Sequence, residues 1–287
     1  MTTLPERAAR RCYGVVNPIH STLYFSPDLP REFARAGLDD EKAVYFAARS
    51  APMGRVGAGT VTAAFYNFKH ELVAQHIPHA WDSVSPEDAL DARLRAVDSL
   101  LTRLLGEEAI ASKEMTEVAE LALRAAEGCS RPARPLYAAN ADLPVPEAPH
   151  LAYWHAATLL REYRGDGHLT ALLSAGLDPV EALASHTASG RGMSPKWILA
   201  SRGWSPREWE AAKERLRDRG LLAADDELTA SGTELRRALE DETDRLDRAP
   251  YAHLGATGVA RLTELAGAFA GAAQAAGAFP ADLIGKR

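Results

Sequence analysis

Apolar residues recur three or four positions apart along much of the chain, and the alternation typical of β-strands is scarce. Residues 88–105 place leucines and a valine at this spacing after Ser85-Pro86, a pair that suits a helix start. Residues 113–126 repeat the pattern, and Gly128 is placed to end that helix. The sequence therefore predicts a mainly α protein.

Prolines interrupt the helical pattern in the middle of the chain. Five of them fall within residues 129–149, a density that a helix interior does not tolerate. We predict a Pro-rich linker there, between two helical halves of similar size. The predicted domains are an N-terminal helical domain at 1–128, the linker at 129–149, a winged-helix domain at 150–250, and a C-terminal helix and tail at 251–287.

One tetrapeptide occurs in both halves. The letters AGLD at 36–39 recur at 175–178, each time before an alanine-rich segment. A duplicated half predicts pseudo-twofold packing with a cleft between the halves. Four identical residues also arise by chance in a chain rich in alanine and leucine, so duplication and coincidence both stay open.

Residues 194–244 hold the most informative local pattern. Ser-Pro pairs at 194–195 and 205–206 each open a helix, and a capping box at 231–234 opens a third. Between the second and third helices, two apolar ends at 221–222 and 228–229 flank a polar turn at 224–227, which predicts a small β-hairpin. Helix, turn, helix, hairpin wing and helix is the winged helix-turn-helix plan.

The run RGWSPREWEAAKERLRDRGLLAADDELTASGTELRRALEDETDRL resembles the MarR-type winged-helix domain. Three further stretches, NPIHSTLYFSPD, YFAARSAPMGRVGAGTVTAAFYNF and HAATLLREYRGDGH, extend the resemblance over both halves. With them the chain is similar to a largely uncharacterised actinobacterial helix-turn-helix family that is often described as MarR-like. The resemblance implies a shared fold, and it brings no established role for any single residue.

The overall charge does not favour nucleic acid. The chain has 33 Lys and Arg against 39 Asp and Glu, a net charge of −6, so DNA binding would need a local basic patch. Arg207, Lys213 and Arg217, on the predicted recognition helix, are the residues that would contact phosphates or bases. The wing carries three acidic residues at 225–227, which would repel the DNA backbone and disfavour DNA as a partner.

The segment 150–168 carries the candidate chemistry. On a helical projection His155, Glu162 and Asp166 share one polar face, and two glycines near the end of the segment are predicted to stop the helix. In a catalytic site, His155 or His168 would transfer a proton and Glu162 would orient the imidazole. The other interpretation is an ordinary amphipathic helix whose polar stripe faces water.

Residues elsewhere in the chain would complete a ligand pocket between the two halves, with arginines that hold an anionic or carbonyl group. The predicted ligand-binding residues are His20, Tyr24, Arg49, Asn67, Arg161, Arg164 and Asp166, and the predicted catalytic residues are His155, Glu162 and His168. The two cysteines match no metal-binding spacing, and the histidines form no HExxH pair. No metal site is predicted, and any cofactor is left unspecified.

These patterns predict a small-molecule-binding protein whose pocket could support catalysis. The alternative function is a MarR-like, ligand-responsive, DNA-binding transcription regulator, and a third is a non-catalytic interaction module. No apolar run is long enough to cross a membrane and the start of the chain lacks a leader pattern, so we expect a cytoplasmic protein without a membrane partner. The C-terminal run 259–278 predicts a helix that covers the core or forms a homodimer interface.

Overall fold

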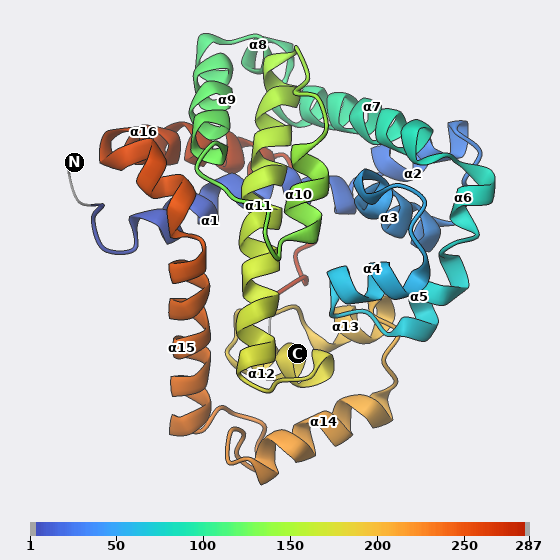
Figure 1. The fold of residues 1–287 in the computed structure, drawn as a ribbon, viewed down its shortest axis with the longest axis vertical. Helices are drawn as coiled ribbons and strands as arrows, with labels where there is room; N and C mark the ends of the chain where they lie inside the picture. The colour runs from blue at the N-terminus through green and yellow to red at the C-terminus, as the bar shows by residue number, and fades with distance from the viewer. Residues whose placement is uncertain (1–3, 285–287) are drawn as a thin grey trace. The chain divides into compact units, whose positions relative to one another are not determined.

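The computed structural model describes residues 4–284, and these residues contain helices α1–α16, two short 3₁₀ turns and no β-strand (Figure 1). The prediction of a mainly α fold is therefore confirmed. The helices predicted at 88–105 and 113–126 are α7 (Pro86–Leu105) and α9 (Lys113–Ala126). The Ser85 hydroxyl caps α7 by accepting the backbone N–H of Asp88 at 3.0 Å.

The described residues form two compact units, each assembled from segments that are distant in the sequence. Unit 1 holds the chain up to Val56 with His76–Asp166 and Leu246–Phe279, and unit 2 holds Gly57–Gln75, Gly167–Arg245 and the chain from Pro280. The segment 129–149, predicted as a linker, lies inside unit 1 and contains α10 (Pro135–Ala141). The contiguous domains at 1–128, 150–250 and 251–287 stay a prediction.

Unit 1 is held together by packing between long helices. The N-terminal helix α1 (Ala8–Ser21) lies along α16 (Arg248–Ala275), α16 also contacts α9, and α2 (Asp28–Arg35) lies along α7. Its other helices are α3 (Glu41–Ser50), α6 (Ala80–Ser83), α8 (Glu107–Ile110), α10 and the first part of α11 (Pro149–Ser174). The burial of their apolar faces is the main force that stabilises this unit.

The predicted C-terminal helix at 259–278 lies mostly within α16. Its apolar residues Leu262, Leu265 and Phe269 are buried in unit 1, where α16 contacts α1 and α9. This face therefore covers the core of unit 1, which is one of the two uses that the sequence left open. A homodimer stays a prediction.

Unit 2 contains the segment in which the winged-helix pattern was found. Trp209, Ala212 and Leu216 on α14 (Pro206–Asp218) pack into one core with Ile198 and Leu239. Ser205 and Glu208 form a complete capping box at the start of α14, as the Ser-Pro pattern indicated. The other helices of unit 2 are α4 (Ala58–Phe65), α5 (His70–His76), α12 (Pro179–Ala188), α13 (Pro195–Ser201) and α15 (Ala230–Leu246).

The predicted β-hairpin wing is wrong. In its place residues 221–229 form a tight turn with one isolated antiparallel bridge, between Leu222 and Leu228. Asp226 adopts the left-handed conformation at φ 67° and helps to close the turn. Strands cannot extend because α14 ends just before the turn and α15 begins directly after it, so the two arms have length for only one bridged pair. We call this segment the 221–229 turn.

Two predicted helix boundaries are also wrong. The glycines at 165 and 167 do not stop α11, which continues to Ser174. Glycine costs a helix about 1 kcal/mol relative to alanine, and the buried residues Leu160 and Leu172 on either side offset that cost by packing. Helix α15 starts at Ala230, and the cap is the Thr229 hydroxyl, which accepts the N–H of Gly232 at 3.0 Å.

The repeated AGLD tetrapeptide forms the same helix end twice. Gly37 and Gly176 both have positive φ, 100° and 62°. The leucine after each glycine donates its N–H to the carbonyl five residues earlier. The N···O distance is 2.9 Å for Leu38 and 3.2 Å for Leu177. This is the Schellman motif, in which glycine supplies the left-handed residue and an apolar residue follows. A shared local motif therefore explains the repeat, and a duplication of the halves stays a prediction.

Candidate functional site

A buried polar cluster lies on the unit 1 part of α11, where the sequence predicted the chemistry. His20 from α1 places its Nδ1 2.7 Å from the Thr158 hydroxyl and its Nε2 3.1 Å from the hydroxyl of Tyr24. The His20 imidazole also stacks on the Trp154 indole, with ring centroids 5.2 Å apart and an interplanar angle of 17°. Burial, reinforced by nearby arginines, lowers the pKa of His20 well below its usual value, so its ring is neutral at pH 7.

The centre of the cluster is an ion pair between α3 and α11. Arg49 donates from Nε and Nη2 to the two oxygens of Glu162, at 3.3 Å and 3.0 Å. Arg161 adds a third cationic contact to the same carboxylate at 3.5 Å. Burial alone would raise the pKa of Glu162, but Arg49 and Arg161 hold it below its usual value. Glu162 is therefore an anion whose oxygens are already committed to the protein.

Two further predicted residues lie on α11, just C-terminal to Glu162. Arg164 pairs with Asp247 at 3.3 Å and lies over the Tyr13 ring, 4.7 Å from its centroid. Asp166 accepts the backbone N–H of Tyr137 at 3.0 Å. Burial, reinforced by Glu162, raises the pKa of Asp166 to about 7 in spite of that hydrogen bond. These groups tie α11 to its neighbours in unit 1.

A cavity of about 250 Å³ in unit 1 adjoins this cluster. Arg93 from α7, together with Trp154 and His155 from α11, contributes the polar part of the lining. The apolar part comes from Leu90, Leu94, Leu143, Pro144 and Pro146, and the exposed carboxylates of Glu87 and Asp91 complete it. The cavity lies wholly within unit 1.

Arg93 is the unusual residue of the cavity. Only 5% of it is exposed, its guanidinium lies over the Trp154 ring at 5.3 Å, and Nη1 donates to the carbonyl of Ala48 at 3.1 Å. In the described part of unit 1 no carboxylate pairs with it, and burial lowers its pKa to about 10. A buried charge without a counterion is costly, and it is uncommon outside functional sites.

The neighbouring histidine is neutral. His155 is 4% exposed, and burial followed by the charge of Arg93 lowers its pKa to about 4. At pH 7 the ring can therefore donate a hydrogen bond from one nitrogen and accept one at the other. Among the predicted catalytic residues, His155 is the one that lines this cavity.

The other predicted site residues do not line this cavity. His168 and Asn67 belong to unit 2, where His168 Nδ1 lies 2.8 Å from the Thr243 hydroxyl. The backbone carbonyl of Asn67 accepts from the Trp204 indole at 2.9 Å, while its side-chain oxygen is buried without a partner. Sequence reasoning missed Arg93 and Trp154. The available signal was an arginine at a position of the helix 88–105 that the apolar spacing assigns to the buried face.

The candidate nucleic-acid interface lies in unit 2. Helices α13 and α14 are joined by a short turn in which Gly203 has φ 81°, and α12 packs against both helices. This arrangement has the helix, turn and helix that the sequence predicted.

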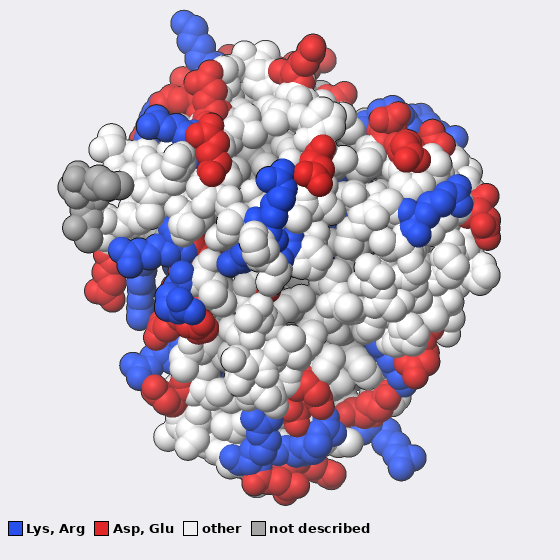
Figure 2. Space-filling model, in the orientation of Figure 1, with Lys and Arg blue, Asp and Glu red and all other residues white. Residues whose placement is uncertain are grey.

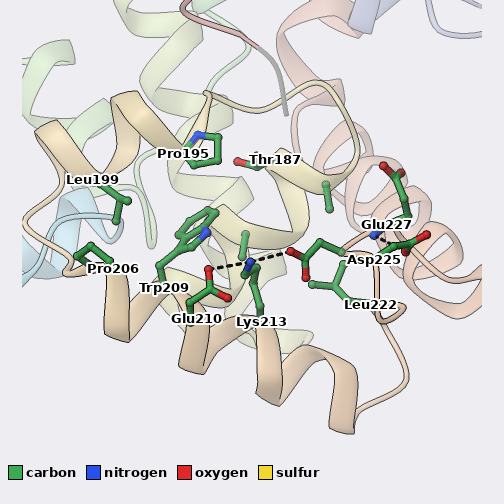
Figure 3. A pocket seen from close by; sticks show the side chains of 13 residues that line it. Thr187, Pro195, Leu199, Pro206, Trp209, Glu210, Lys213, Leu222, Asp225 and Glu227 are labelled. Carbon is green, nitrogen blue, oxygen red and sulfur yellow. Dashed lines mark hydrogen bonds and ion pairs between the residues drawn. The ribbon is translucent and has the colours of Figure 1, made fainter. Parts of the chain in front are cut away.

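The cations of α14 are held by carboxylates of the same unit. Lys213 lies between Glu210 and Asp226, at 2.8 Å and 2.7 Å. Lys213 and Glu210 line a groove of about 400 Å³ (Figure 3). Arg217 also pairs with Asp226, whereas Arg207 is exposed. In the region of α14, basic and acidic side chains lie next to one another on the visible face (Figure 2). The helix that would meet DNA therefore presents few uncompensated positive charges.

The sequence model of a helix-turn-helix family matches residues 9–280. The chain belongs to this helix-turn-helix family. No curated protein and no solved structure matches the chain. The family match covers nearly all of the described residues of this helix-turn-helix protein, including the cavity of unit 1 and the helices of unit 2.

Residues 4–284 of the helix-turn-helix protein contain no candidate membrane-spanning helix and no candidate cluster of metal ligands. No helix there is both long enough and apolar enough to cross a membrane. No three side chains of the types His, Cys, Asp or Glu gather there as metal ligands.

Proposed function

We propose that this helix-turn-helix protein binds a small molecule in the cavity of unit 1. The observation that carries the proposal is Arg93, a buried guanidinium that lines a cavity and has no carboxylate partner in the described residues. Ligand sites commonly combine an apolar wall with a few convergent polar groups, and this cavity has that composition.

The residues predicted from the sequence take different parts in this proposal. His155 touches the ligand and can exchange a proton or a hydrogen bond with it. Glu162, Arg49 and His20 are positioning residues, because Glu162 and Arg49 bind each other, and His20 binds Thr158 and stacks on Trp154. The network fixes the Trp154 wall of the cavity. We propose binding at this site and assign it no reaction.

A cavity-filling variant tests the proposal. A set of small acids, amides and amines is screened for a rise in the midpoint of thermal unfolding of the wild-type protein. Leu143→Trp, which places an indole at the cavity wall, should abolish the rise caused by every compound that binds. Val145→Trp is the matched control, since Val145 is on the same loop, is exposed and does not line the cavity. Compounds that stabilise the Leu143→Trp protein as strongly as wild type would place binding elsewhere.

A second candidate function is DNA binding through α14, as expected for a MarR-like regulator of the actinobacterial type that the sequence resembles. Membership of a helix-turn-helix family and the arrangement of α12, α13 and α14 favour it. The pairing of Lys213 and Arg217 with Asp226 opposes it, because cations that are already neutralised gain less from phosphates.

Replacement of Asp226 by asparagine should therefore strengthen DNA binding. The change frees Arg217 from its partner and leaves Lys213 with Glu210 alone. In fluorescence-anisotropy titrations with duplex DNA, the slope of log K against log salt should steepen by about 1 to 2, since each added phosphate contact contributes about 0.9. Asp218→Asn removes the same charge from exposed α14 without freeing a cation and should leave the slope unchanged. Absence of binding by all three proteins at low salt would end the DNA candidate.

A further inference from the structure

We propose that the ligand of the unit 1 cavity is a compact monoanion, such as a monocarboxylic acid with a short apolar or aromatic body, and that its acid group binds Arg93. The inference rests on the proposed function and names the class of molecule that the cavity takes. It follows from the donors, the charges and the apolar surface of the lining.

The buried part of the polar lining offers hydrogen-bond donors, whereas the acceptor carboxylates of Glu87 and Asp91 lie at its exposed rim. Arg93 has five N–H groups, of which Nη1 is bound to Ala48. The Trp154 indole N–H is buried and has no partner in the described structure, and Trp154 is only 1% exposed. His155 can donate one further N–H. A ligand that satisfies these groups must bring acceptor oxygens, and a carboxylate offers about four lone-pair sites to donors.

The buried charges around the cavity also favour an anion. Three arginines lie near the single carboxylate of Glu162: Arg49 from α3, Arg93 from α7, and Arg161, which directly precedes Glu162 in the chain. The pKa of His20 is lowered by burial and then by all three arginines, as expected where cations outnumber anions. A bound anion would supply the counterion that Arg93 lacks, in a region where water screens little.

The acidic rim limits the charge that can enter. Glu87 and Asp91 line the same cavity, but both are exposed, so water and salt weaken their effect on a group bound at Arg93. Their repulsion is larger for a ligand with several charges, such as a nucleoside triphosphate. The remaining surface, five leucine and proline side chains, suits an apolar body. A single acid group on a compact apolar body satisfies both the interior and the rim.

Matched pairs of acids and amides test the inference. Benzoate against benzamide, phenylacetate against phenylacetamide, and hexanoate against hexanamide differ chiefly in the charge of one group. By isothermal titration calorimetry with the wild-type full chain at pH 7, each acid should bind at least about tenfold more tightly than its amide. The comparison needs no variant, so it does not depend on the folding of an altered protein.

Substitution of Arg93 tests whether this residue causes the preference for acids over amides. Arg93→Gln should weaken binding of the acids on the order of 30-fold or more while changing the amides little, and Arg93→Lys should recover part of the loss. Arg124→Gln, an exposed arginine on α9, is the matched control and should bind like wild type.

The outcomes separate the two proposals. If amides bind as tightly as acids and Leu143→Trp abolishes both, the cavity binds small molecules but the anion inference is wrong. If acids bind equally to the wild-type and Arg93→Gln proteins, Arg93 is not the binding group and the inference is likewise overturned. If neither acids nor amides bind, and no other compound of the screen does, both proposals fail.

Discussion

Replacement of Glu162 by glutamine is expected to lower the free energy of unfolding by about 3–5 kcal/mol, the usual cost of leaving a buried charge unpaired. Glu162 is 1% exposed and is the shared counterion of Arg49 and Arg161. Glutamine has nearly the same size, so the loss comes from charge and not from a cavity. Urea unfolding at pH 7, followed by circular dichroism, measures the change.

A surface pair gives the matched control for that result. Glu234 and Arg237 form an ion pair on α15 with side chains 62% and 64% exposed. Glu234→Gln should cost no more than about 1 kcal/mol, because solvent screens an exposed pair. The double variant Arg49→Met, Glu162→Leu should recover part of the stability lost in Glu162→Gln, since it removes the buried Arg49 charge together with its partner and leaves only Arg161, whose side chain is 23% exposed, without this carboxylate. If Glu162→Gln costs as little as Glu234→Gln, the pair is not the structural centre of unit 1.

The helices could be predicted from the sequence because their signals are local. The Ser-Pro starts of α7 and α14 place the capping serine and the first helical turn within a few residues of each other. The apolar spacing in α9 likewise needs no knowledge of the rest of the fold. Signals of this kind lie within the segment that forms the helix, so they do not depend on contacts with the rest of the fold.

Boundaries that depend on tertiary packing could not be predicted. The glycines in α11 signalled a stop, but burial of the helix on both sides outweighed their propensity. The wing was inferred from two apolar ends flanking a polar turn, a pattern that a single bridge satisfies as well as a hairpin. The AGLD repeat, by contrast, is a local signal, because it forms the same kind of helix end at two places in the chain.

The candidate site could be predicted only in part, because its residues come from distant segments. The polar face of α11 was visible in the sequence, and it is buried as the small-molecule interpretation required. Its partners were not assignable: Arg49 lies 113 positions from Glu162, and His20 lies 138 positions from Thr158. Arg93 and Trp154 gave no motif at all. Their importance comes from a missing counterion, which only the packed structure reveals.

The second large effect expected is a change in the pH dependence of stability on replacing Asp166 by asparagine. The pKa of Asp166 is raised by burial from 3.8 to about 7, so between these values the folded protein binds a proton that the unfolded chain releases. This contribution to stability is fully present below pH 4 and is lost as the pH rises through about 7. Its slope reaches about 1.4 kcal/mol per pH unit.

The Asp166→Asn protein should lack this loss, and above pH 7 it should be more stable than wild type by up to a few kcal/mol. Asparagine retains an oxygen for the N–H of Tyr137, so the hydrogen bond is kept. Urea unfolding from pH 4 to pH 8 gives the difference between the two proteins, in which the opposite contribution of His155, whose pKa is lowered to about 4, cancels. Asp142→Asn, at a side chain 72% exposed, should follow the wild-type profile. Parallel profiles for the Asp166→Asn and wild-type proteins would mean that Asp166 is ionised in folded unit 1 and that burial does not dominate its environment.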